Sequence, residues 1–161
     1  MRIIRLTILS SFLTVDFLLL IFRRGIINHK ERAQQLISFE GMERRRGIIP
    51  TDIDGFIDYK GGVFVYIEAK LINAPVTVGQ RLALENVVKS HEQAQNKACS
   101  IIFRHDTEAK DIIIAKDQVV DETYFKLNGE LEWRKPKIED FSLIRFLHWW
   151  EGHCEREGFT L

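Results

Sequence analysis

The sequence contains few cysteines, prolines and glycines, and it has no excess of positive or negative charge. Only two cysteines, Cys99 and Cys154, occur among 161 residues. Neither lies in a Cys-x-x-Cys pair, which excludes a disulfide scaffold and a four-cysteine zinc site and favours a reducing compartment. Three prolines and ten glycines are too few for a collagen-like or disordered chain. Basic and acidic residues both number 23, which excludes a uniformly basic coat for nucleic acid but leaves room for a local basic patch.

The remaining composition is that of a folded domain. Hydrophobic residues make up 45% of the chain and charged residues 29%. A chain of this length buries roughly two-thirds of its unfolded surface and folds without staples. We therefore expect one globular domain over residues 26–161, located in the cytoplasm.

Residues 1–25 differ from the rest because they contain a long apolar run, which is strongest from Leu6 to Phe22. A signal peptide is one interpretation, but no small-x-small cleavage site follows the run. A membrane-associated helix is a second, although Asp16 inside the run costs roughly 2.5–3.5 kcal/mol on insertion scales. An apolar helical extension outside the working domain is the third, and it is our prediction. Membrane association of residues 6–22 remains its rival.

Hydrophobic periodicity along the remainder predicts an α/β domain. The expected helices cover residues 29–42, 77–96 and 140–157, the last capped by Asp140 with Phe141, Ile144, Leu147 and His148 inward. The expected strands cover residues 53–59, 63–69, 98–104 and 111–115, with a further strand or hairpin at 124–133. Residues 53–69 form an antiparallel hairpin, and residues 63–104 form a right-handed βαβ unit. The predicted architecture is a mixed sheet flanked by helices.

The hairpin carries charged residues on strands that are otherwise apolar. With a three-residue turn at 60–62, Asp54 lies opposite Glu68 and Asp52 lies opposite Lys70. Paired side chains share a face, so this register gathers all four charges on one surface. A two-residue turn at Gly61-Gly62 would shift the pairing by one and scatter them.

Two carboxylates this close are costly when both are ionised, and a divalent cation resolves the conflict. Hard oxygen ligands suit Mg²⁺ or Mn²⁺, so Asp54, Glu68 and the backbone carbonyl of Ala69 are candidate ligands. Lys70 would orient or help to deprotonate an attacking water, or stabilise charge on the phosphate. These residue types suit phosphodiester hydrolysis. Taken singly, each carboxylate is also an ordinary residue of a loop or strand end.

The hairpin resembles the core of the PD-(D/E)xK nuclease superfamily, which includes restriction enzymes, Holliday-junction resolvases and VRR-type nucleases. In that pattern Asp54 would be the first acid, and Glu68-Ala69-Lys70 the second motif. The resemblance covers about residues 29–104 and implies a restriction-endonuclease-like fold and a nuclease that uses Mg²⁺ or Mn²⁺. Pro50 is not adjacent to Asp54, which departs from the pattern, and Asp52 is the rival for the first acid.

Gln80 opens the helix after the hairpin, as a glutamine does beside the active site in several branches of the superfamily. The resemblance implies that it assists catalysis. Thr77-Val78-Gly79-Gln80 is also a capping box, which explains Gln80 without catalysis, and both roles can hold together.

Contact with DNA would fall to local basic groups. Arg44, Arg45 and Arg46 precede the first strand and are the main candidates; Lys89, Lys97, Arg104 and Lys110 are weaker ones. Each is equally explained as a solvated surface charge. His91 is expected at the core edge, and His148, His153 and Cys154 are expected in an aromatic helix rather than a zinc site.

We therefore predict a small Mg²⁺- or Mn²⁺-dependent deoxyribonuclease, similar to phage or prophage enzymes and resolvases, that acts on DNA, including branched or single-stranded forms, as a candidate homodimer. The alternative is a catalytically inactive module with the same fold that binds DNA or a protein partner. A membrane-anchored accessory protein is a third interpretation, which rests only on residues 6–22.

Overall fold

The computed structural model describes residues 52–161, which fall within the second of two compact units, Pro50–Leu161. Several predictions lie outside the described residues: the apolar extension and its boundary at residue 25, the helix at 29–42, and the basic run at 44–46. Within residues 52–161, no helix has the length and apolar character that crossing a membrane requires.

A five-stranded mixed sheet forms the centre of the described unit, and its strands lie side by side in chain order. They are β1 (Gly55–Asp58), β2 (Val63–Leu71), β3 (Lys97–His105), β4 (Val119–Leu127) and β5 (Glu130–Arg134). Strands β2 and β3 are parallel and are joined through helix α3 (Val78–Gln93), whereas the other neighbours are antiparallel. The predicted combination of a hairpin and a βαβ unit is confirmed.

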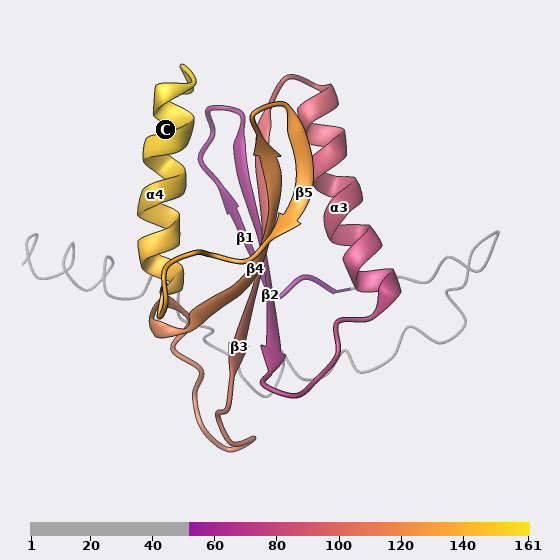
Figure 1. The fold of residues 1–161 in the computed structure, drawn as a ribbon, viewed down its shortest axis with the longest axis vertical. Coiled ribbons are helices and arrows are strands. Elements are labelled where there is room, and N and C mark those ends of the chain that lie inside the picture. Colours follow the sequence, from indigo (N-terminus) through magenta and orange to yellow (C-terminus); the bar gives the residue numbers. More distant parts are fainter. Residues whose placement is uncertain (1–51) are drawn as a thin grey trace, which may run out of the picture. The chain divides into compact units, whose positions relative to one another are not determined.

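The two helices cover opposite faces of this sheet (Figure 1). Helix α4 (Leu143–Arg156) packs on the face that carries the odd-numbered residues of β2 and β3. The larger core lies there, around Trp150, and includes Val63, Val65, Cys99, Ile101, Phe103, Val120, Phe125, Leu143, Phe146 and Cys154. Helix α3 packs on the other face against Ala98 and Tyr124 through Val88. Glu68 and Lys70 have even numbers and therefore lie on the α3 face.

The strand predicted at residues 111–115 is wrong. Ile112, Ile113 and Ile114 are exposed in a loop, and a short 3₁₀ helix, η2 (Ala115–Asp117), follows them. The place beside β3 is taken instead by β4, a nine-residue strand whose alternation between the two faces is interrupted only by a bulge at Asp121. A run of three isoleucines is apolar enough for a strand, but it lacks the length and alternation of its competitor.

The hairpin expected near residues 124–133 is confirmed, although its first strand begins earlier, at Val119. Asn128 and Gly129 connect β4 to β5 with φ values of 54° and 90°. Two successive residues with positive φ form the turn that matches the twist of a β-hairpin, and Asn-Gly is its preferred sequence.

The last helix begins later than predicted, and of the residues predicted inward only Phe141 and Leu147 pack against the core. Its N-cap is Ser142, not Asp140, which has a φ of 52° and lies before the helix. The inward residues are Leu143, Phe146, Trp150, His153 and Cys154, whereas Ile144 and His148 are exposed. The bulk of Trp150, which is 0% exposed, sets which side of the helix faces the sheet.

Candidate functional site

The turn between β1 and β2 has the three residues that the candidate site requires. The Tyr59 N–H donates to the Val63 carbonyl across it at 3.1 Å. Gly62 has a φ value of 79°, which glycine adopts without strain. Lys60 also has a positive φ value, 64°. The turn also lies against the end of the chain, because a Cβ at Gly61 would meet the Thr160 carbonyl oxygen at 1.7 Å.

This turn sets the predicted register, which is confirmed. Gly55 lies opposite Ile67, and Phe56 lies opposite Tyr66. Continued by one residue, the same register places Asp54 opposite Glu68. The Asp54 Oδ2 atom accepts a hydrogen bond from the Ala69 N–H at 2.7 Å, so the first carboxylate is held against the strand that carries the second.

Glu68 is the centre of the arrangement. Its Oε1 atom lies 2.7 Å from the Lys70 ammonium and accepts a hydrogen bond of 2.9 Å from the Gln80 amide. The Glu68 side chain is 4% exposed and that of Lys70 is 16% exposed. Three residues that the sequence analysis singled out are therefore in direct contact, and Asp54 lies on the adjoining strand.

Burial raises the pKa of the Glu68 carboxyl. The contact with Lys70 opposes this effect, while the negative charges of Asp54 and Asp52 add to it. A buried carboxylate beside two others is the electrostatic conflict that a divalent cation relieves. Asp54 and Glu68 oxygens, with the Ala69 carbonyl and Asp52, remain the predicted ligands for Mg²⁺ or Mn²⁺. Within residues 52–161, no group of three or more His, Cys, Asp or Glu side chains is arranged to hold a metal ion.

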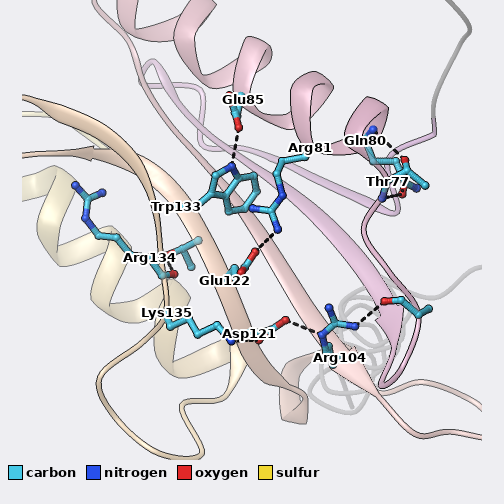
Figure 2. Close-up of polar contacts among 12 residues, drawn as sticks. Thr77, Gln80, Arg81, Glu85, Arg104, Asp121, Glu122, Trp133, Arg134 and Lys135 are labelled. Carbon is cyan, nitrogen blue, oxygen red and sulfur yellow. Dashed lines mark hydrogen bonds and ion pairs between the residues drawn. The ribbon is translucent and has the colours of Figure 1, made fainter.

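Gln80 forms the predicted capping box and also contacts Glu68, while its assistance to catalysis remains a prediction. Thr77 caps helix α3, and its hydroxyl accepts a hydrogen bond from the Gln80 N–H at 3.2 Å. The Gln80 Oε1 atom accepts in return from the Thr77 N–H and hydroxyl (Figure 2). Since its Nε2 atom donates to Glu68, the capping box orients the amide that contacts the buried carboxylate.

Helix α3 is fixed over the sheet by side chains that the sequence analysis did not single out. The Arg81 guanidinium lies over the Trp133 ring, 4.4 Å from its centroid, and donates to Glu122 on β4. The Trp133 N–H donates in turn to Glu85 (Figure 2). These contacts join the first turns of α3 to β4 and β5 and so hold Gln80 in place beside β2.

Arg104 fastens the connection between β2 and α3. Its Nε atom is 2.6 Å from Asp121 (Figure 2), and its Nη1 atom donates to the carbonyls of Leu71, Ile72 and Ala74. Asp121 is the extra residue of a bulge in β4, and bulges redirect side chains in this way. Pairing across β2 and β3 also places Arg104 directly beside Lys70.

The other weak DNA-binding candidates are likewise engaged within the chain. Each forms an ion pair: Lys89 with Glu85, Lys97 with Glu92 and Glu157, and Lys110 with Glu108. Their contact with DNA remains a prediction.

His91, His153 and Cys154 lie where the sequence suggested, whereas His148 is exposed instead of inward. His91 sits at the core edge, with its ring 4.1 Å from that of Phe64. His153 and Cys154 are buried in the aromatic core under α4, where His153 stacks on Trp149. Both cysteines are free, and burial raises the pKa of each thiol.

Comparison of the chain with protein-family models, with curated proteins and with solved structures gave no match. The case for a function therefore rests on the geometry of the Asp54, Glu68, Lys70 and Gln80 side chains.

Proposed function

We propose that the chain is a metal-dependent nuclease of the PD-(D/E)xK type that hydrolyses phosphodiester bonds in DNA. The observation that carries the proposal is the environment of Glu68. A nearly inaccessible carboxylate is contacted by an ammonium and an amide, and a second carboxylate is hydrogen bonded one residue further along the same strand. A Glu68–Lys70 ion pair with only a structural role would not require Asp54 beside it or a hydrogen bond from Gln80.

Asp54 and Glu68 would hold Mg²⁺ or Mn²⁺ through their carboxylate oxygens. When bound, such a cation supplies positive charge that stabilises the added negative charge on the phosphate in the transition state. Gln80 keeps the Glu68 carboxylate in one orientation. Rigid orientation matters because catalytic groups must be set before the reaction begins.

Lys70 is the residue placed to serve the attacking water. Its ammonium is a compact charge with three donors, so it can contact Glu68 and a water at the same time. The water oxygen forms a bond to phosphorus and releases one proton, one ester P–O bond breaks, and the departing oxygen takes up one proton, so that water is added across the broken bond. No covalent intermediate between enzyme and DNA is required.

The test is cleavage by the full chain of supercoiled, linear, single-stranded and four-way-junction DNA, with Mg²⁺, Mn²⁺ or EDTA. We expect Lys70→Met and Glu68→Gln to reduce metal-dependent cutting by about 10²–10⁴-fold, as the loss of a positioned catalytic group does. Asp54→Asn should do the same. This variant is the safest structurally, because Asp54 is exposed. Glu132→Gln, on the opposite edge strand, is the matched control and should cut normally.

Thermal unfolding of each variant separates loss of the site from loss of the fold. Removing one partner of a buried ion pair costs roughly 3–5 kcal/mol, so a folded Lys70→Met chain is required before its activity is interpreted. Equal cutting by wild type and all three variants would overturn the proposal. Failure of the wild type to cut any substrate with either metal would also overturn it, in favour of an inactive binding module.

A further inference from the structure

A row of aromatic rings continues from the candidate site along the hairpin. Phe56, Phe64 and Tyr66 have even numbers and therefore share the α3 face of β1 and β2 with Glu68. Phe56 lies directly opposite Tyr66, and this pair is the next one on the same face after Asp54 and Glu68. The centre of the Phe56 ring is 5.1 Å from that of Tyr66 and 6.2 Å from that of Phe64.

Phe56 leaves one side of this row exposed to solvent, and His91 of helix α3 contacts the other two rings. Phe56 is 55% exposed on the edge strand β1. Behind it, His91 of α3 stacks on Phe64, and its Nε2 atom is 2.8 Å from the Tyr66 hydroxyl. The Tyr66 hydroxyl and the His91 ring nitrogen are thus within hydrogen-bonding distance. The rings are therefore held in position before any ligand arrives.

We propose that Phe56, with Tyr66 beside it, stacks on the unpaired base of a nucleotide next to the phosphodiester held at Glu68. The substrate class is then single-stranded or locally unpaired nucleic acid. This inference rests on the proposed nuclease function. Residues two apart on a strand lie about 6.6–6.8 Å apart, so the ring and the carboxylates fall within reach of neighbouring parts of one nucleotide unit.

The choice of an unpaired base follows from the geometry of stacking. A flat exposed ring can stack on any base, since every base has a π-face, and such contacts carry much of sequence-tolerant single-strand binding. In a duplex, both faces of a base are already covered by its neighbours, so an intact duplex has nothing to offer Phe56. The adjoining Lys70 supplies a positive charge for the backbone at the other end of the row.

The test measures binding by the full chain in EDTA, so that it does not depend on cleavage. The probes are a fluorescent thymidine 12-mer, the same strand with abasic sites, and the matching duplex. Phe56→Leu should weaken binding of the 12-mer about tenfold, the usual effect of losing one stacked base, and Phe56→Trp should retain it. Ile138→Ala is the control, because Ile138 is 53% exposed outside the row and should bind as wild type does.

The abasic strand should bind wild type no better than the thymidine strand binds Phe56→Leu. The inference is overturned if Phe56→Leu binds the thymidine strand as tightly as wild type does. A change in oligomeric state with unchanged DNA binding would overturn it too, and would assign the rings to contact with a second copy. Cutting by wild type with ring-independent binding would refute only this inference. Ring-dependent binding without any cutting would refute only the nuclease.

Discussion

One amide group connects the start of helix α3 to the candidate site. The side-chain oxygen of Gln80, Oε1, completes the capping box with Thr77, and the side-chain nitrogen, Nε2, donates to Glu68. Because both ends of the amide are occupied, neither contact can be improved by rotating the side chain without losing the other. The stability of the helix and the orientation of the carboxylate therefore depend on the same residue.

Paired substitutions separate these two roles. Thr77→Ala should cost about 1 kcal/mol of unfolding free energy through loss of the cap, with little effect on cleavage. Gln80→Ala should cost a similar amount and also reduce cleavage about 10–100-fold, as loss of a group that orients a ligand does. Urea unfolding and the cleavage rate, measured on both variants, check this. Equal activity of the two variants would reduce Gln80 to a capping residue.

Residues at this scale were predictable where local spacing decides their position. The capping box is a pattern of four consecutive residues, and alternation alone places Glu68 and Lys70 on one face. The contact between Gln80 and Glu68 could not be read from the sequence, because it depends on how α3 lies over β2. That position is set by Arg81 and its partners on distant strands.

The connection between β2 and α3 shows how one element can be positioned by another. Residues 71–74 follow Lys70 and lead to Thr77, and three of their carbonyls accept hydrogen bonds from Arg104. The bulge in β4 brings Asp121 to the same guanidinium. The end of the strand that carries the proposed catalytic lysine is therefore fixed by β3 and β4.

Replacing Arg104 should loosen this connection. We expect Arg104→Met to speed amide hydrogen exchange at residues 71–76 and to reduce kcat about 10–100-fold, because small displacements of a reacting group are costly. Lys135→Met is the matched control, since Lys135 also contacts Asp121 but donates to none of these carbonyls. Mass spectrometry of exchange and steady-state cleavage give the two readouts. Unchanged exchange at residues 71–76 would contradict the role assigned to Arg104.

Elements were predictable where the chain carries its own turn chemistry. Lys60-Gly61-Gly62 indicated the first hairpin, but the choice between a three-residue and a two-residue turn, and with it the register, came from the structure. The run at residues 111–115 was misassigned because strand formation depends on a free neighbour in the sheet, and β4 is the better one. Local apolar character cannot reveal that competition.

The aromatic core between α4 and the sheet contains one buried titratable side chain of α4, His153. His153 is 8% exposed, stacks on Trp149 and lies near Trp150. Burial lowers the pKa of His153 from 6.5, and the charges of Lys97 and Arg156 act in the same direction, while those of Glu157 and Glu92 oppose it. The folded core therefore favours the neutral ring.

This shift gives the molecule a pH-dependent stability. In the unfolded chain His153 gains a proton below about pH 6.5, whereas in the folded chain it stays neutral to lower pH. The stability it contributes is thus complete above pH 6.5 and is lost as the pH falls from there through its folded pKa. His153→Phe should flatten the dependence of unfolding free energy on pH in that window, as measured by urea titration. His148→Gln, on the exposed side of the same helix, should leave the dependence intact.

The packing of the helices on the sheet was the hardest feature to predict from the sequence. Composition and periodicity gave the α/β class and the mixed sheet, because those follow from the order of elements and short connections. The start of α4 and the choice of its buried side depend on the fit of Trp150 in the core between the helix and the sheet. No local pattern encodes that fit.

The hairpin at residues 55–71 tolerates some changes of length and not others. A one-residue insertion or deletion within a strand, between the turn and Asp54 or between the turn and Glu68, would move that carboxylate to the opposite face of the sheet. A change confined to the turn at residues 60–62 leaves the strand pairs as they are and keeps both carboxylates on one face. The spacing of each carboxylate from the end of its own strand therefore constrains the site, and the number of turn residues does not.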